Sequence, residues 1–140
     1  MASLVFRSIL STGTRDLGDG EPDQFFSDIN LSDHEHLPAL LLLETKNVSF
    51  LKNFISINAV PEDVMGTDYE RSRDEYYFAQ RLLENPTDNW VLQVVYIPAG
   101  HLREDNNRLG IHSRNEQGNA SGNRDNFCVC RIFLIYFGDV

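Results

Sequence analysis

A short stretch from Asn53 to Asn58 places side chains with possible chemistry at a regular spacing. Its β-branched and aromatic residues are typical of a strand, and successive side chains on a strand point to opposite faces. Phe54, Ser56 and Asn58 would therefore share one face. A hydroxyl beside an aromatic ring, followed by an amide, is a usual composition of a small-molecule cleft. A half-buried strand whose Ser56 and Asn58 simply face water fits the same pattern.

Three familiar motifs are incomplete in this sequence. Residues 33–36 (Asp-His-Glu-His) have the His-x-His spacing of a metal site, but no third and fourth ligand can be named, so no metal is predicted. Ser56 lies inside a predicted strand rather than at a Gly-x-Ser-x-Gly turn, which argues against a serine hydrolase. The sequence contains neither a Gly-rich phosphate loop nor a dinucleotide fingerprint.

Strands and a few helical segments would have to position these side chains. Apolar, β-branched and aromatic runs predict strands at 4–9, 53–58, 90–97 and 127–137. Cap-like and apolar patterns predict helical segments at 23–28, from 32 into the run 40–43, and at 68–84. The run 127–137 is apolar on both faces except at Arg131, which predicts a central strand covered on both sides. The long polar stretch 101–126 predicts a functional loop.

The length and charge of the chain restrict its class. Its 140 residues predict a single domain, residues 1–140, with a core that needs no metal or disulfide. The net charge is −9, and residues 1–70 carry most of it, with four Lys or Arg against twelve Asp or Glu. Such a chain has no electrostatic attraction to nucleic acid or anionic lipid, so neither is predicted as a partner. The sequence also has no apolar run of the roughly 18 residues that a membrane span needs.

Arg7 occupies an unusual position in the first predicted strand. It shares a face with Val5 and Ile9, where a guanidinium requires an anionic partner. That partner is either a structural carboxylate or a ligand that bears phosphate, and the residue pattern leaves both open.

Five short segments, in order along nearly the whole chain, are similar to one known family. The segments are 4–8 (LVFRS), 28–34 (DINLSDH), 54–58 (FISIN), 109–118 (LGIHSRNEQG) and 136–138 (YFG). They are similar to an opening Leu-Tyr-Arg strand, an Asn-Ile-Asn-Leu-Tyr-Asp-His segment, a Ser-Thr-Ser strand, a Glu-x-Glu loop and a closing His-Phe-Gly. On these segments the chain resembles the ADP-ribosyltransferase toxins, cholera and heat-labile enterotoxin A-subunit type.

The resemblance implies a fold, a substrate and a setting. The implied fold class is α+β, with two packed β-sheets and flanking helices around an NAD cleft. The implied activity is that of a secreted toxin or effector, which transfers ADP-ribose from NAD to a host protein. The opening residues lack the charged and apolar regions of a signal peptide, so none is predicted, which is what the mature form of a secreted chain would show.

The resemblance also assigns binding roles to particular residues. Arg7, with Ser8 next to it, would hold the nucleotide end of NAD through paired N–H donors. His34 would help to position NAD. Asn58 takes the third place of the family's Ser-Thr-Ser strand and would line the same cleft.

The catalytic residues implied by the resemblance are Ser56 and Glu116. In the family, the first Ser orients a Glu that stabilises the cation formed as nicotinamide leaves. Without a shift in the alignment, Gly118 takes the place of that Glu and the domain would be inactive. A two-residue slip would put Glu116 there instead, with Arg114 upstream. The sequence therefore leaves two functions open: a mono-ADP-ribosyltransferase, or an inactive toxin-like domain that acts by binding a protein.

Overall fold

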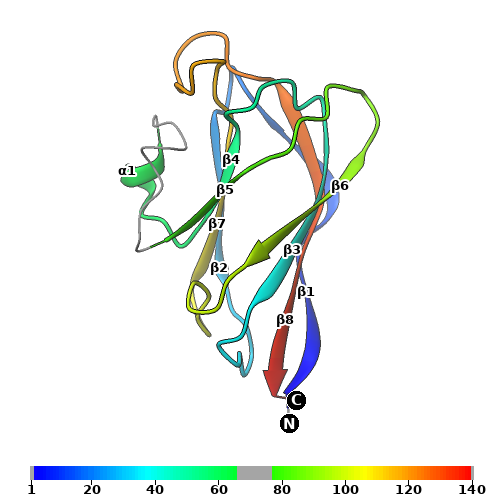
Figure 1. Cartoon of the computed structure of the whole chain (residues 1–140), viewed down its shortest axis with the longest axis vertical. Coiled ribbons are helices and arrows are strands. Elements are labelled where there is room, and N and C mark those ends of the chain that lie inside the picture. Colours follow the sequence, from blue (N-terminus) through cyan, green and yellow to red (C-terminus); the bar gives the residue numbers. More distant parts are fainter. Residues whose placement is uncertain (1, 66–76, 140) are drawn as a thin grey trace.

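The computed structural model describes residues 2–65 and 77–139, which form a sandwich of two four-stranded sheets (Figure 1). The strands are β1 (Ala2–Leu17), β2 (Asp23–Ile29), β3 (Ala39–Lys46), β4 (Phe54–Ile57), β5 (Phe78–Arg81), β6 (Val91–Ile97), β7 (Asn107–His112) and β8 (Phe127–Asp139). The first sheet has the order β1-β8-β3-β6 and the second β2-β7-β4-β5. All neighbouring strands within each sheet are antiparallel.

The connections give this sandwich a jelly-roll topology. Every connection between consecutive strands crosses from one sheet to the other, except that β4 and β5 are neighbours in the second sheet. Eight antiparallel strands wound in this way between two sheets form a double-sheet jelly roll. One consequence for function is that strands far apart in the sequence, such as β1 and β8, become neighbours.

The α+β prediction, with helices flanking an NAD cleft, is wrong. The described residues contain one helix, the four-residue α1 (Pro61–Val64), and it is too short to flank a sheet. Segment 23–28 belongs to β2, 40–43 to β3, and 78–81 forms β5. The rest of the predicted 68–84 helix falls largely outside the described residues. No helix among the described residues has the length and apolar character needed to cross a bilayer.

The Leu run of β3 shows why this prediction failed. An apolar run without gaps fits a buried helix and a buried strand equally well. In the structure β3 is a strand because β8 and β6 provide hydrogen-bonding partners on both of its edges. Its burial then alternates with period two, so that Leu41 and Leu43 are fully buried while Leu40 is 38% exposed.

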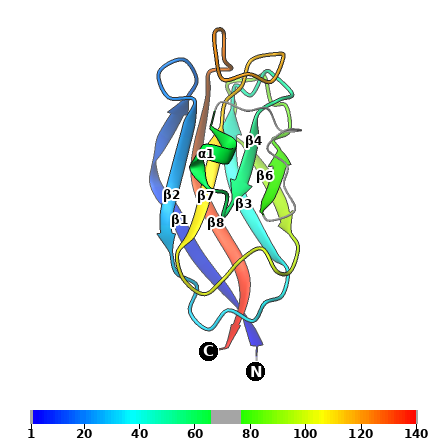
Figure 2. The ribbon, with the colours of Figure 1, turned by 90° about the vertical axis from the view of Figure 1, so that its left-hand side faces the viewer.

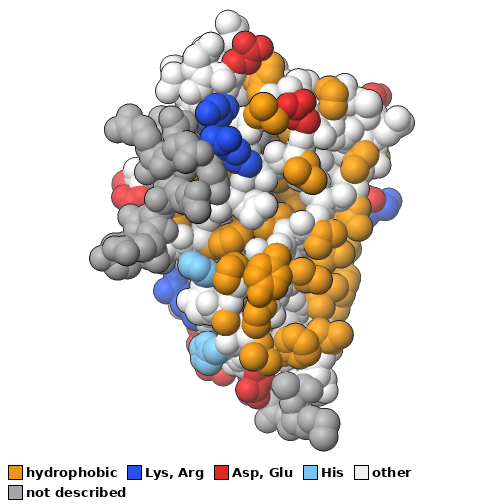
Figure 3. All heavy atoms as spheres, in the orientation of Figure 1, with side chains coloured by type: hydrophobic (Ala, Val, Ile, Leu, Met, Phe, Trp, Pro, Cys, Tyr) orange, Lys and Arg blue, Asp and Glu red, His pale blue; other side chains and the backbone are white. Residues whose placement is uncertain are grey.

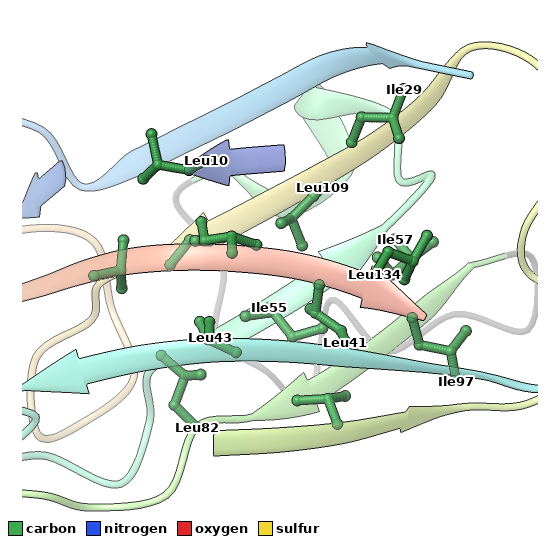
Figure 4. Packing of buried hydrophobic residues seen from close by; sticks show 14 of the residues in the cluster. Leu10, Ile29, Leu41, Leu43, Ile55, Ile57, Leu82, Ile97, Leu109 and Leu134 are labelled. Carbon is green, nitrogen blue, oxygen red and sulfur yellow. The ribbon is translucent and has the colours of Figure 1, made fainter. Parts of the chain in front are cut away.

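The core lies between the two sheets (Figure 4). Leu41, Leu43 and Leu134 extend from the first sheet toward Ile55 and Leu109 of the second. The predicted central position of the last strand is confirmed, because β8 pairs with both β1 and β3. Its second face, by contrast, is only partly covered by the described residues, because Phe133, Ile135 and Phe137 on that face are half-buried.

Candidate functional site

Four polar side chains meet on the outer face of the second sheet, the face turned away from the core. Asp23 begins β2, Ser56 lies in β4, His112 ends β7, and Arg114 follows two residues later. Because β7 lies between β2 and β4, residues from three distant segments become neighbours. In the register, His112 is opposite Asp23 on one side and opposite Phe54 on the other. We call Asp23, Ser56, His112 and Arg114 the polar network.

Strand alternation explains why these side chains face outward. Ile55 and Ile57 of β4 point into the core, and so do Leu109 and Ile111 of β7. The residues between them, including Ser56, must therefore point to the other face. The helix α1 lies over the outer face of this sheet (Figure 2). Val64 of α1 and Tyr77 form a second small apolar cluster with Phe54 of the sheet.

The polar network is held by short hydrogen bonds. Ser56 Oγ lies 2.8 Å from His112 Nε2, and His112 Nδ1 lies 2.6 Å from Asp23 Oδ1. Arg114 Nη2 lies 2.9 Å from the same Asp23 oxygen and donates to the Val64 carbonyl at 2.6 Å, which ties the network to α1. The His112 ring also stacks on Phe54, with ring centroids 4.4 Å apart.

The charges of this network follow from its burial and its contacts. Burial favours the neutral form of His112 and is the largest cause that lowers its pKa, although Asp23 acts in the opposite direction. Burial raises the pKa of Asp23, but the hydrogen bond to His112 and the charge of Arg114 together outweigh it, so that the pKa ends below its ordinary value. At neutral pH the network therefore holds neutral His112 between Ser56 and an ionised Asp23 that is paired with Arg114.

The order Ser56–His112–Asp23 is that of a catalytic triad, with the expected nitrogen facing each partner. A nucleophile must also reach its substrate, and Ser56 is only 1% exposed while His112 is fully buried. The backbone of Gly110 leaves no room above the pair, since a Cβ placed there would lie 2.5 Å from Ser56 Oγ and 2.6 Å from His112 Nε2. β4 is paired on both edges, so its backbone N–H groups are not arranged as an oxyanion hole. We conclude that the network stabilises the folded chain.

Arg7 and Ser8 lie away from this network. Arg7 belongs to β1 of the first sheet, and its guanidinium donates to the carbonyl of Ser8 at 2.6 Å and to that of Asn30 at 3.4 Å. Ser56 points away from the first sheet. The structure therefore does not bring Arg7 and Ser56 together, as the expected NAD cleft would require.

His34 lies near the C-terminal end of β8, where it forms an isolated β-bridge with Gly138. Its ring contacts His36 and Tyr136, with centroids 5.2 and 5.8 Å away. The side chain is buried, which lowers its pKa, and neither ring nitrogen has a hydrogen-bond partner among the described residues. The pKa of Tyr136 is raised by burial, although the charge of Arg7 acts in the opposite direction.

The remaining predicted residues have local contacts. Asn58 has φ +60° and donates to the carbonyl of His101 at 2.7 Å, so it holds a turn. Glu116 is exposed and lines a shallow hollow next to Lys52. Gly118 donates its N–H to the carbonyl of Asn115 in a turn of the β7–β8 loop. The hydroxyl of Ser56 is bonded to His112, so neither alignment of the Glu-x-Glu loop is seen to place a carboxylate on it.

A second candidate site is the outer face of the first sheet. Ten apolar side chains from its four strands project there, and we call them the apolar face. They are Leu4 and Phe6 of β1, Leu40 and Leu42 of β3, Leu92, Val94 and Tyr96 of β6, and Phe133, Ile135 and Phe137 of β8. The strand register makes them contiguous, and Figure 3 shows hydrophobic side chains gathered over this part of the molecule.

The apolar face has a hollow and a sharp boundary. Leu4, Leu40, Tyr96 and Phe137 are among the residues that line a cavity of about 290 Å³, whose walls are almost entirely apolar. Toward the other end of the sheet, charged side chains take over on the same face, with Glu44 paired to Arg131 at 3.3 Å.

Comparison with known proteins does not assign a family. No protein-family model matches the sequence, and no curated protein matches it. The jelly roll by itself does not decide a function, because one fold hosts many unrelated activities. The function must therefore be argued from the two outer faces.

Proposed function

We propose that this chain is a protein-binding domain that acts through its apolar face, without catalysis. The observation that carries the proposal is the contiguous apolar face itself, which contains no charged residue although the chain has a net charge of −9. Exposed single apolar residues are ordinary on proteins, whereas a connected patch across four strands marks a contact surface.

The size of the apolar face supports this proposal. Leu4 is 67% exposed, Phe6 61%, Tyr96 57%, and Leu92 and Val94 54% each. With roughly 150–250 Å² for each fully exposed aromatic side chain and less for Leu and Val, the exposed members present on the order of 600 Å², the upper end of what a typical monomer shows. Aromatic residues, which are enriched at protein interfaces, make up four of the ten.

The transferase activity and NAD binding implied by the resemblance stay predictions. Nicotinamide release from NAD by the purified chain measures that activity directly. We prefer the binding function because of the contacts of the two expected catalytic residues. The hydroxyl of Ser56 is hydrogen-bonded to His112, and Glu116 lies exposed in a loop.

Carbene footprinting, which labels exposed side chains with a photoreactive diazirine, tests the proposal. The labelling of Leu92 and Tyr96 in an extract of the producing cells is compared with labelling of the purified chain at high dilution. Leu83, which is 69% exposed and lies outside the apolar face, is the internal reference. We expect labelling of the apolar face to fall several-fold in the extract relative to Leu83. Equal labelling in both samples would mean that nothing covers the face, and the proposal would be wrong.

A further inference from the structure

We infer that the protein bound by the apolar face is a second copy of this chain, packed face to face about a two-fold axis. This inference rests on the proposed function. A two-fold contact uses the same patch on both copies, so the patch must be complementary to itself in shape and charge.

The absence of charge on the apolar face favours a second copy. Two chains with net charge −9 repel each other, and any carboxylate in a two-fold interface would meet like charges. All ten residues of the apolar face are uncharged, and Glu44, which is opposite Leu92 in the register, lies at its edge and is paired with Arg131. A partner recognised by charge would instead require basic or acidic groups within the patch.

The area of the face is close to what a stable dimer needs. A standard interface buries about 800 Å² on each partner, and lasting homodimer interfaces are more apolar than others. The apolar face, with its half-buried Phe133, Ile135 and Phe137 and its polar rim, approaches that area. Two β-sheets can pack face to face at about 10 Å. The hollow beside Leu40 and Tyr96 gives the second copy a pocket to fill.

The sequence of two strands points to the same conclusion. β6 reads Val-Leu-Gln-Val-Val-Tyr-Ile, and residues 132–137 of β8 are apolar at every position. Runs of this kind are typical of strands covered on both faces. In one chain, Val95 and Leu134 are buried in the core, whereas Val94 remains 54% exposed and Phe133 half-buried on the other side. A second copy on the apolar face supplies the missing cover.

The mass of the purified chain in solution, measured by light scattering after size exclusion from about 1 μM to 1 mM, tests the inference. We expect twice the 16.0 kDa of a single chain at the higher concentrations. Higher salt should strengthen the dimer, because it screens the repulsion between two acidic chains while the apolar contact is unaffected. Tyr96→Asp places two like charges in the interface and should weaken dimerisation by about 100-fold or more. Leu83→Asp makes the same kind of change on an exposed residue outside the face and should leave the mass unchanged.

Each other outcome overturns the inference in a recognisable way. A chain that stays monomeric up to 1 mM, while its apolar face is protected in the cell extract, excludes the second copy but keeps the protein-binding function. A monomer whose face is unprotected in the extract removes both. A dimer that survives Tyr96→Asp and also Phe6→Asp, at the opposite edge of the face, uses another surface. Circular dichroism of each variant at low concentration verifies that it is folded, since both side chains are exposed in the single chain.

Discussion

The outer faces of the two sheets reverse the usual distribution of polar and apolar groups. On the second sheet, Asp23, His112 and Arg114 are removed from water beneath α1, and each has hydrogen-bond or ionic partners. On the first sheet, the side chains exposed to solvent include Phe6 and Tyr96. A covered polar cluster must be fully paired to be stable, whereas an exposed apolar sheet needs a partner from outside.

This contrast separates stability from association. The polar network stabilises a single chain. Removing one of its members takes a hydrogen-bond partner from buried groups, and this cost does not depend on protein concentration. The apolar face contributes to association between chains. Substituting one of its side chains costs a single chain little, because that side chain is already exposed to water. Variants on the two faces should therefore differ in size of effect, and in whether the effect depends on protein concentration.

The largest effect is expected from Asp23→Ala. This change removes the carboxylate that Arg114 Nη2 contacts at 2.9 Å, and it removes the acceptor of the His112 Nδ1 proton. Breaking a buried ion pair from one side costs about 3–5 kcal/mol in free energy of unfolding. Urea denaturation at pH 7 measures the loss, and Asp105→Ala, at an exposed carboxylate, should change stability by less than about 0.5 kcal/mol. A loss below about 1 kcal/mol for Asp23→Ala would contradict the conclusion that the polar network stabilises the folded chain.

A smaller loss is expected from Gly110→Ala, which tests how tightly the network is enclosed. The new Cβ would meet Ser56 Oγ and His112 Nε2 well inside contact distance, and such overpacking costs about 1–3 kcal/mol. Adding Ser56→Ala should recover part of the loss, because it removes the nearer clash. Gly20→Ala is the matched control, since its Cβ would meet nothing within 4 Å. Full stability in Gly110→Ala would mean that the face has room above Ser56, and that a substrate could enter.

The sequence predicted the strands whose signal is local, and it missed what depends on sheet order. The segments 53–58 and 90–97 are β-branched and aromatic, and strands form there. Ser56 also stood out locally, as a hydroxyl on the polar side of a strand. Its partners His112 and Asp23 come from β7 and β2, and only the long-range pairing of those strands brings them together. A buried polar residue in a strand indicates that a partner exists, but not which one.

Acidification should weaken the polar network more gradually than either substitution. His112 and Asp23 both have pKa values below their ordinary values of 6.5 and 3.8, so the unfolded chain binds protons more readily than the folded one. Their stabilisation is complete above those ordinary values and is lost as the pH falls toward the folded values. The free energy of unfolding should decline from pH 7 to pH 5, where protonation of His112 contributes, as does that of the buried His34, whose pKa is also lowered by burial. His112→Gln should reduce that slope, and an unchanged slope would assign the acid sensitivity to other groups.

The smallest effect on the single chain is expected on the apolar face, at Val94. Val94 and Val95 are neighbours on β6 with the same side chain, but Val94 is 54% exposed on the apolar face and Val95 only 4% exposed in the core. At concentrations where the chain is monomeric, Val95→Ala should cost about 1–3 kcal/mol, and Val94→Ala only a few tenths through its lower strand propensity. When the concentration is raised until copies associate, Val94→Ala should weaken dimerisation more than Val95→Ala, because only Val94 lies in the contact. Denaturation curves at low concentration measure the stability of each variant, and light scattering at high concentration measures its dimerisation. If Val94→Ala proved as costly as Val95→Ala in the dilute chain, the face would already be covered within one molecule, and the distinction between the two faces would fail.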